Sequence, residues 1–171
     1  MKLLKDWGFT NTGGRIGSRG EYFVLLQGAL LIGFVFLPVW QPAWLMPLPG
    51  YGSAALKVVA ALLGLAAATF LLKGLLDLGN NLTPFPYPKE EGYLVQTGIY
   101  ATVRHPLYTG LILAALSRTI FVFSLSHLLG TFVLFAFLDA KATREEAWLC
   151  QKYPDYADYK KRVKKLVPML Y

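Results

Sequence analysis

No charged residue occurs between Glu21 and Lys57, and this long neutral stretch limits the possible folds more than any other feature. Tyr22–Trp40, within it, is almost entirely apolar, and about 20 such residues are enough for a helix to cross a bilayer. The whole chain is 55% hydrophobic and 16% charged, whereas soluble domains carry about 25% charged residues. The sequence therefore predicts an integral membrane protein.

Four apolar segments predict four transmembrane helices in a single domain, residues 1–171, whose catalytic half is about 77–171. The segments are Tyr22–Trp40, Ala54–Leu76, Leu107–Phe123 and Leu128–Leu138. The last two are short, which predicts a tight hairpin with its turn at Ser124–His127 and with His127 solvated in that turn. Residues 77–104 form a polar segment in which three prolines exclude a regular helix. The expected fold class is all-α, an integral membrane helical bundle.

Two further patterns refine this bundle. Small residues recur at steps of three and four in the second segment, which predicts that a neighbouring helix approaches closely there; they are Ala60, Ala61, Gly64, Ala67 and Ala68. A final amphipathic helix, capped by Asp155, is expected to lie on the inner membrane surface. Its apolar face would consist of Tyr156, Tyr159, Val163 and Leu166, with Lys and Arg residues on the remainder.

The distribution of positive charge predicts the orientation. Lys and Arg residues gather before the first span, in the polar segment and after Lys141, whereas the opposite side holds only Lys57 and Arg118. By the positive-inside rule, both termini and the active site are expected in the cytoplasm, in a multi-pass protein of the bacterial inner membrane. The net charge of +7 then matches anionic membrane lipids as partners, rather than nucleic acid.

Two polar clusters lie at the two ends of the predicted hairpin, on the same side of the membrane. Arg104 and His105 precede Pro106, which suits the first turn of a helix, so the free N–H groups of that helix end favour an anion. The other end returns Glu145 and Glu146, which diverge by about 100° on a helix and cannot both face one ligand. One would hold a cationic amine, and the other would meet water or Arg104.

Aromatic rings complete this pattern, because Tyr100 and Tyr108 can attract a sulfonium or ammonium group. An anion site, a carboxylate and aromatic rings together match S-adenosylmethionine. The alternative from residue types alone is a set of interfacial anchors and helix caps. The chain has one cysteine and two widely separated histidines, which argues against a metal site.

The C-terminal half resembles the isoprenylcysteine carboxyl methyltransferase family, with which phospholipid N-methyltransferases share the two-cluster design. The resemblance rests on Gly98-x-Tyr100-x-x-x-Arg104-His105-Pro106-x-Tyr108-x-Gly110 and on Glu145-Glu146-x-x-Leu149-x-x-x-Tyr153, followed by Tyr156-x-x-Tyr159-x-x-Arg162-Val163 and Pro168. It covers roughly residues 92–168. It implies a membrane enzyme that uses S-adenosylmethionine, releases S-adenosylhomocysteine and has no Rossmann domain.

The resemblance also implies site residues. The cofactor contacts carried over by position are Gly92, Tyr93, Leu94, Val95, Tyr100, His105, Pro106, Leu107, Tyr108 and Glu145. The eukaryotic enzymes place an arginine, as a substrate contact, where this chain has Lys141, and a glutamine in the loop where this chain is proline-rich. Both departures count against a prenylcysteine acceptor.

The expected reaction is methyl transfer to a lipophilic small molecule or lipid that enters sideways from the membrane. A carboxylate or thiol acceptor needs only a cation to hold it, and Lys141 and Arg144 are the candidates. An amine acceptor needs a base, for which Glu146 or Asp139 would serve. The sequence leaves open whether oxygen, sulfur or nitrogen is methylated, and it leaves the oligomeric state open.

Two rival functions remain at this stage. One is an NADPH-dependent membrane reductase of the sterol-reductase type, whose C-terminal segment is similar but which lacks the Glu145-Glu146 pair. The other is a non-catalytic membrane scaffold or subunit. Binding of S-adenosylhomocysteine, NADPH or neither separates the three, because a ligand of the folded state raises the melting temperature.

Overall fold

The fold is all-helical, as predicted. The structure is a computed structural model that describes residues 20–45, 51–83, 87–89 and 91–171. Its elements are α2 (Glu21–Val35), η1 (Ala43–Leu45), α3 (Tyr51–Leu78), η2 (Gly79–Asn81), η3 (Gly98–Ala101), α4 (Pro106–Val122), α5 (Leu125–Lys152) and α6 (Tyr156–Arg162). Within these ranges the only β-type pairing is an isolated parallel bridge between Val103 and Lys164. Predictions on the basic residues before position 20, and on prolines 47, 49, 84 and 86, lie outside the described residues.

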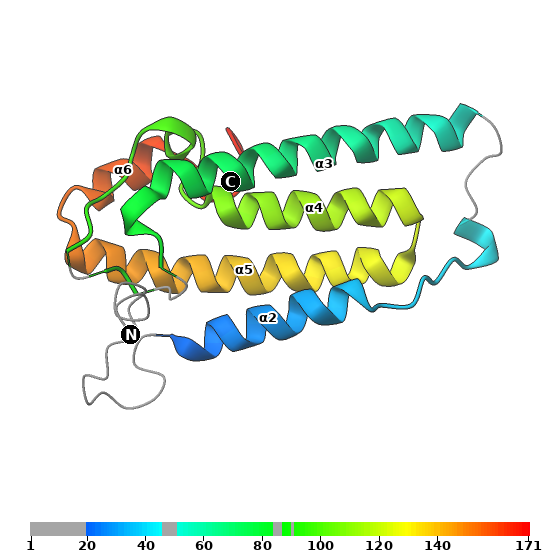
Figure 1. Cartoon of the computed structure of the whole chain (residues 1–171), viewed down its shortest axis with the longest axis horizontal. Helices are drawn as coiled ribbons and strands as arrows, with labels where there is room; N and C mark the ends of the chain where they lie inside the picture. Colours follow the sequence, from blue (N-terminus) through cyan, green and yellow to red (C-terminus); the bar gives the residue numbers. More distant parts are fainter. Residues whose placement is uncertain (1–19, 46–50, 84–86, 90) are drawn as a thin grey trace.

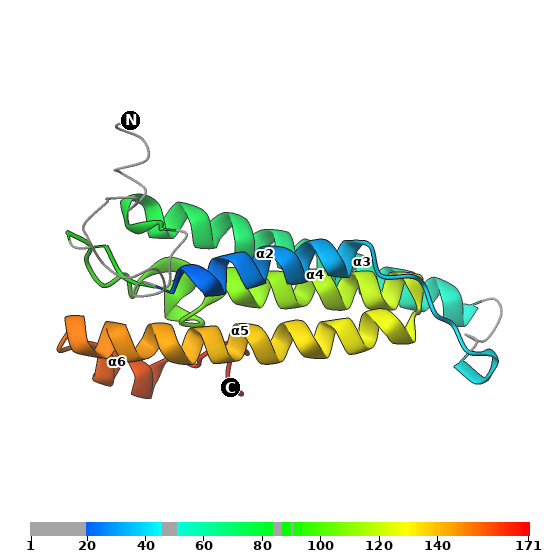
Figure 2. The ribbon, with the colours of Figure 1, turned by 90° about the horizontal axis from the view of Figure 1, so that it is seen from below.

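Four apolar helices run lengthwise beside one another, with α4 between α3 and α5 (Figures 1 and 2). Two are long and apolar enough to cross a membrane, Ala54–Asn81 and Leu125–Lys152, while α2 and α4 are shorter apolar helices. Large apolar side chains stay exposed along them, among them Leu25, which is 71% exposed, and Leu65, which is 68% exposed. Extensive exposed apolar surface is typical of contact with lipid. The bundle is therefore a membrane helical bundle, and the number of crossings stays a prediction.

The stripe of small residues on α3 receives α4, as predicted. A Cβ atom at Gly64 would lie 3.2 Å from the hydroxyl of Ser117, and that hydroxyl donates to the carbonyl of Ala60 at 2.7 Å. Gly110 on α4 is equally tight, since a Cβ there would lie 2.6 Å from the side chain of Leu71. Such stripes hold membrane helices together because small side chains let the two backbones approach closely.

The hairpin of α4 and α5 differs from the prediction in its second arm. Instead of ending near Leu138, α5 continues to Lys152 as one helix of 28 residues, so the arm is not short. Charged residues after Leu138 do not stop a helix, because Lys, Arg and Glu are good helix formers. The α5 helix thereby carries the Glu145-Glu146 pair out to the end of the bundle where α6 lies (Figure 1).

The turn of this hairpin is also tighter than expected. It consists of Phe123, which has a left-handed φ of 49°, and Ser124, which caps α5. His127 belongs to the first turn of α5 and is fully buried, so the prediction of a solvated turn residue was wrong. The imidazole packs edge-on against Phe34 of α2, with 5.4 Å between ring centroids. The aromatic neighbour and the Ser124 hydroxyl at Nδ1 offset part of the cost of this burial, and Nε2 has no partner among the described residues.

The final helix is shorter than predicted and faces protein rather than lipid. The α6 helix has seven residues, Asp155 makes no side-chain capping hydrogen bond, and Val163 lies in extended backbone beyond the helix end. Tyr156 and Tyr159 are buried at 1% and 2% exposure. The apolar face of this segment is thus occupied by the bundle itself, and the prediction of a helix lying on the membrane surface was wrong for this face.

Candidate functional site

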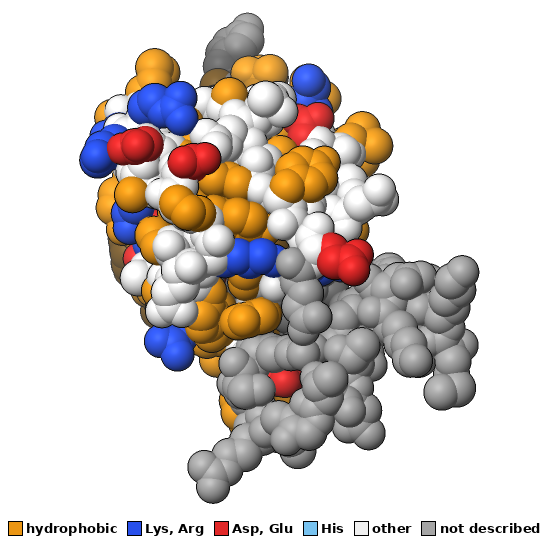
Figure 3. Space-filling view, turned by 90° about the vertical axis from the view of Figure 1, so that its left-hand side faces the viewer, with side chains coloured by type: hydrophobic (Ala, Val, Ile, Leu, Met, Phe, Trp, Pro, Cys, Tyr) orange, Lys and Arg blue, Asp and Glu red, His pale blue; other side chains and the backbone are white. Residues whose placement is uncertain are grey.

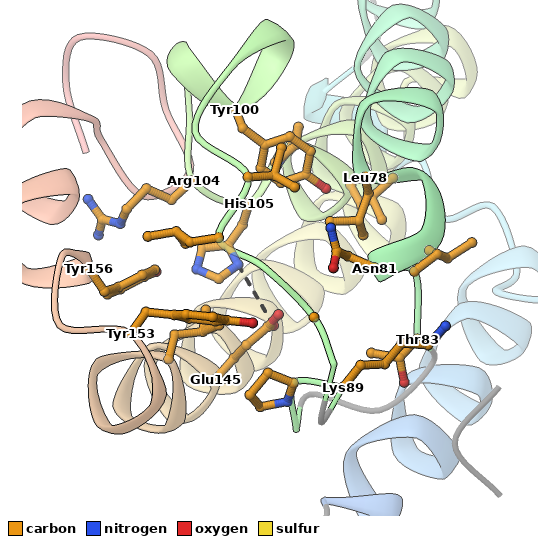
Figure 4. Close-up of a pocket in the computed structure, with 18 of the residues that line it drawn as sticks. Leu78, Asn81, Thr83, Lys89, Tyr100, Arg104, His105, Glu145, Tyr153 and Tyr156 are labelled. Carbon is orange, nitrogen blue, oxygen red and sulfur yellow. Dashed lines mark ion pairs between the residues drawn. The ribbon is translucent and has the colours of Figure 1, made fainter. Parts of the chain in front are cut away.

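A pocket of about 300 Å³ lies at the polar end of the bundle, between the end of α3, the loop after it, the start of α4 and the last part of α5 (Figure 4). Ligand sites usually measure about 300–1,000 Å³. Figure 3 views this end and shows acidic and basic side chains gathered around apolar ones. All ten cofactor residues expected from the sequence line this pocket: Gly92, Tyr93, Leu94, Val95, Tyr100, His105, Pro106, Leu107, Tyr108 and Glu145.

The loop wall of the pocket is fixed to the end of α3 through Asn81. The amide oxygen of Asn81 accepts a hydrogen bond from the backbone N–H of Tyr93 at 3.0 Å. Gly92 is needed beside it, because a Cβ there would lie 3.1 Å from that same oxygen and 3.2 Å from the hydroxyl of Tyr153. The Asn81 nitrogen Nδ2 is buried and has no partner among the described residues. The pocket wall therefore offers an unused donor.

Tyr100 is held on the opposite wall by the short helix η3. The carboxylate of Asp77 accepts from the N–H of Ile99 at 2.7 Å, which ties η3 to α3. The hydroxyl of Tyr159 donates to the carbonyl of Tyr100 at 2.6 Å. Burial, and then the negative charge of Glu145, raise the pKa of Tyr100 well above its ordinary value. Its hydroxyl therefore stays a neutral hydrogen-bonding group at physiological pH.

The start of α4 brings His105 and Tyr108 against the pocket. Pro106 occupies the first turn and His105 the capping position, without a side-chain capping bond. The rings of His105 and Tyr108 stack at 5.3 Å between centroids and 1° between planes. The N-terminal turn of α4 thus borders the cavity, as predicted, and a helix N-terminus favours an anionic ligand group.

The side chains of Glu145 and Glu146 lie in different surroundings, because successive residues on a helix point about 100° apart. Glu145 lines the pocket, where its Oε2 accepts from the hydroxyl of Tyr108 at 2.7 Å and lies 3.8 Å from Nδ1 of His105 (Figure 4). Its side chain is 25% exposed, and its carboxylate suits a cationic amine. Glu146 is only 3% exposed and does not line the pocket.

Glu146 is instead the centre of a buried ionic brace. Its Oε1 lies 2.7 Å from Nη2 of Arg104 and 3.2 Å from Nε2 of His105, and its Oε2 lies 3.0 Å from Nζ of Lys160. Arg104 also donates to the carbonyl groups of Lys160 and Val163. The guanidinium is thereby occupied in joining α5 to α6, so a ligand anion would depend on the other groups of this wall.

The backbone strengthens the same junction. The N–H of Arg104 donates to the carbonyl of Lys164 at 2.8 Å, and the N–H of His105 donates to that of Lys165 at 3.2 Å. The hydroxyl of Thr109 donates to the carbonyl of Leu166 at 2.7 Å. Residues 164–166 therefore clamp the segment that begins α4.

The residues expected to act on the acceptor separate into two groups. Lys141 is buried at 4% exposure and lines the pocket. Arg144 is exposed, lies over the ring of Trp148 with its guanidinium carbon 4.9 Å from the centroid, and does not line the pocket. Asp139 pairs with Lys165 at 2.5 Å. The structure brings Lys141 to the cofactor residues, and it brings neither Arg144 nor Glu146 into the cavity.

Sequence reasoning missed several lining residues, among them the polar side chains of Gln27, Asn81 and Tyr156. The hydroxyl of Tyr156 is buried without a partner among the described residues, and burial raises its pKa. Asn81 and Tyr156 carry no signal of their own in a single sequence. Gln27 does carry one, because it is an isolated amide within an apolar span, and polar groups at membrane depth are usually functional.

The chain is similar to known proteins over the region that forms this pocket. The sequence model of the isoprenylcysteine carboxyl methyltransferase (ICMT) family matches residues 59–151, more than half of the chain. The chain is also 39% identical over 79 residues to a protein-S-isoprenylcysteine O-methyltransferase of Schizosaccharomyces pombe. That similarity covers 45% of this chain and 34% of the relative, about a third of its length.

Proposed function

Because the chain belongs to the isoprenylcysteine carboxyl methyltransferase family, we propose that it is a membrane methyltransferase that uses S-adenosylmethionine to methylate a lipophilic acceptor. One observation carries the proposal. The ten residues that the resemblance assigns to the cofactor come from a loop, a helix start and a distant helix, and all of them line one pocket. Interfacial anchors would have no reason to converge on a cavity.

The residues of the pocket fit the chemistry of this cofactor. The carboxylate of Glu145 suits the amine of its methionine part, while the N-terminus of α4 suits the carboxylate. The unpartnered Nδ2 of Asn81 and hydroxyl of Tyr156 offer polar groups for a ribose or a base. When bound, the cofactor supplies a methyl group on a positive sulfur, which an acceptor carboxylate, thiol or amine attacks in line. The chain then has to orient the two reactants and exclude water.

The acceptor is expected to approach from the membrane and to meet Lys141. That side chain lies at the pocket wall, on the part of α5 that packs against α2. The relative from Schizosaccharomyces pombe is named for a prenylcysteine carboxylate, and a lipophilic carboxylate is the acceptor class that fits a buried ammonium. Roles in the reaction for Arg144 and Glu146 gain no support from their positions and stay predictions.

Ligand binding tests this proposal against its two rivals. We expect S-adenosylhomocysteine, and not NADPH, to raise the melting temperature of the purified protein in detergent, by the mass-action effect of a ligand on the folded state. A transfer assay with labelled S-adenosylmethionine and a membrane lipid extract should then place label in lipid-soluble product. Stabilisation by NADPH alone would favour a reductase, and stabilisation by neither would favour a scaffold. Label confined to water-soluble products would contradict a lipophilic acceptor.

We also propose that the pocket faces the cytoplasm of a bacterial inner-membrane protein, and cysteine labelling tests this. Cys150 is exposed at the pocket end of α5. Ala43 is exposed in η1, which lies at the opposite end of the bundle (cyan in Figure 1). In inverted vesicles, an impermeant maleimide should label Cys150 of the unaltered protein but not Ala43→Cys made in a Cys150→Ala background. The reverse pattern would invert the orientation.

A further inference from the structure

Gln27 is the one side chain with a hydrogen-bonding group between Phe23 and Phe36 of the first apolar span. An amide at membrane depth is costly unless it has a partner. Its partner is Lys141, whose Nζ donates to Oε1 of Gln27 at 2.5 Å across 114 positions of sequence. Gln27 lies outside residues 59–151, so the family match does not include it.

The groups in direct contact with the ammonium of Lys141 are neutral, and the negative charge of Glu145 acts on it from further away in the same pocket. Besides contacting the amide oxygen of Gln27, the ammonium lies 5.1 Å from the centroid of the Tyr108 ring. None of the ion pairs among the described residues involves Lys141. Glu145, one helical turn further along α5, accepts instead from the hydroxyl of Tyr108. A buried charge without an opposite charge in direct contact is unfavourable, which makes an anion in the pocket a suitable counterpart.

The amide of Gln27 also determines the charge on this side of the pocket. An ammonium has only donors, so Gln27 must present its oxygen to Lys141, and its own NH₂ group is turned away from it. A neutral amide holds the ammonium in place without adding a negative charge beside it. A carboxylate at the same place would hold it equally well and cancel the charge.

Packing on both sides fixes Gln27 at this place. One turn before it, Phe23 of α2 packs against Phe137 of α5, with 6.2 Å between ring centroids. Two turns after it, Phe34 packs against the buried His127 of α5. The amide thus lies on the face of α2 that contacts α5, between two aromatic contacts.

We propose that Gln27 is a positioning residue, which holds the Lys141 ammonium at the pocket wall so that the site selects an anionic group on the lipophilic acceptor. This inference rests on the proposed function, since it assigns the acceptor side of the same pocket. It makes α2 part of the specificity machinery.

The test uses a pair of probes that differ only in charge: farnesylthioacetate and its methyl ester. Binding of each to the full-length protein, saturated with S-adenosylhomocysteine in detergent, is measured by titration calorimetry. The wild type should bind the acid at least about tenfold more tightly than the ester, the scale of one hydrogen bond to a charged group. Gln27→Glu should remove that preference, and Gln27→Met should reduce it about threefold to tenfold. Affinity for S-adenosylhomocysteine should change less than about twofold in both.

Leu26→Met is the matched control, because the neighbouring Leu26 is 51% exposed on the outer face of α2 and should leave every affinity unchanged. The inference is overturned if the wild type binds acid and ester alike, or if Gln27→Glu and Gln27→Met keep the full preference. Parallel loss of S-adenosylhomocysteine affinity in both variants would also overturn it, by assigning Gln27 to the cofactor or to the fold. If the wild type does not bind S-adenosylhomocysteine, the proposed function is contradicted instead. The comparison of acid and ester without that ligand then still tests whether Gln27 controls the preference for an anion.

Discussion

The two ends of the α4–α5 hairpin both bury polar groups, but they bury different kinds. At the pocket end, the charged side chains of Arg104 and Glu146 form a buried network that also contacts His105. At the turn end, the hydroxyl of Ser124 accepts from the backbone N–H of Trp40 at 3.1 Å and lies 3.1 Å from Nδ1 of His127. The turn end holds its helices with neutral hydrogen bonds.

This difference indicates separate roles for the two ends of the α4–α5 hairpin. Buried charges cost several kcal/mol each to desolvate, so neutral partners are the cheaper means of joining helices. The turn end uses that cheaper means and joins α2, α4 and α5. The pocket end buries charge beside a cavity, where the brace around Glu146 holds Glu145 and His105 in position. The predictions below separate bracing from binding.

The largest effect is expected for the brace. Arg104→Ala leaves Glu146 buried without its guanidinium partner, which should lower the free energy of unfolding by about 3–5 kcal/mol. Unfolding by sodium dodecyl sulfate in mixed micelles measures this. Arg162→Ala, which removes only exposed hydrogen bonds to the side chain of Gln96 and the carbonyl of Asp158, is the control. Equal stability of the two variants would contradict a structural role for Arg104.

Glu145→Gln should act on binding instead. It removes the negative charge that faces the pocket but keeps a partner for the hydroxyl of Tyr108. We expect the affinity for S-adenosylhomocysteine to fall by about 1–3 kcal/mol, with unfolding nearly unchanged. Calorimetry on the folded variant gives the answer, and wild-type affinity would remove Glu145 from the cofactor site.

Ser124→Ala tests the turn end. Loss of the helix cap and of the hydroxyl shared with Trp40 should lower stability by about 1 kcal/mol. Affinity for S-adenosylhomocysteine should not change, because the pocket lies at the other end of α4. A cofactor defect in a stable Ser124→Ala protein would show that the two ends are coupled.

The smallest effect is expected for Arg144→Ala. The guanidinium is exposed over Trp148 and outside the pocket, so stability should change by less than about 0.5 kcal/mol. Methyl transfer should stay within about twofold of the wild type. A large loss of turnover with unchanged folding would instead support the role in holding the acceptor that its sequence position suggested.

The sequence was sufficient to locate the apolar helices, because hydropathy is a local property. The family resemblance selected ten residues that line one pocket, and their contact with a cofactor stays a prediction. The sequence also predicted that Glu145 and Glu146 would face different ways, since helix geometry alone requires this. Helix geometry could not tell which of the two would meet the pocket, because that depends on how α5 rotates against α4 and α6, and only the family resemblance assigned Glu145 to it. The burial of His127 was missed for the same reason, as its neighbour Phe34 is distant in sequence.

Long-range partners explain the other errors. Tyr156 and Tyr159 form an apolar face that a sequence assigns to lipid as readily as to protein. Only the pairing of residues 103–105 with 164–166 shows that protein covers it. Gln27 was an isolated polar residue in a span, but its partner Lys141 lies 114 positions away.

The clamp formed by residues 164–166 has a consequence for biogenesis. The apolar helices are translated, and can insert, before those residues leave the ribosome, yet the backbone N–H groups of Arg104 and His105 find their acceptors only there. Insertion and maturation of the pocket are therefore separate stages in time. A nascent chain stalled before position 160 should be membrane-integrated and still unable to retain S-adenosylhomocysteine.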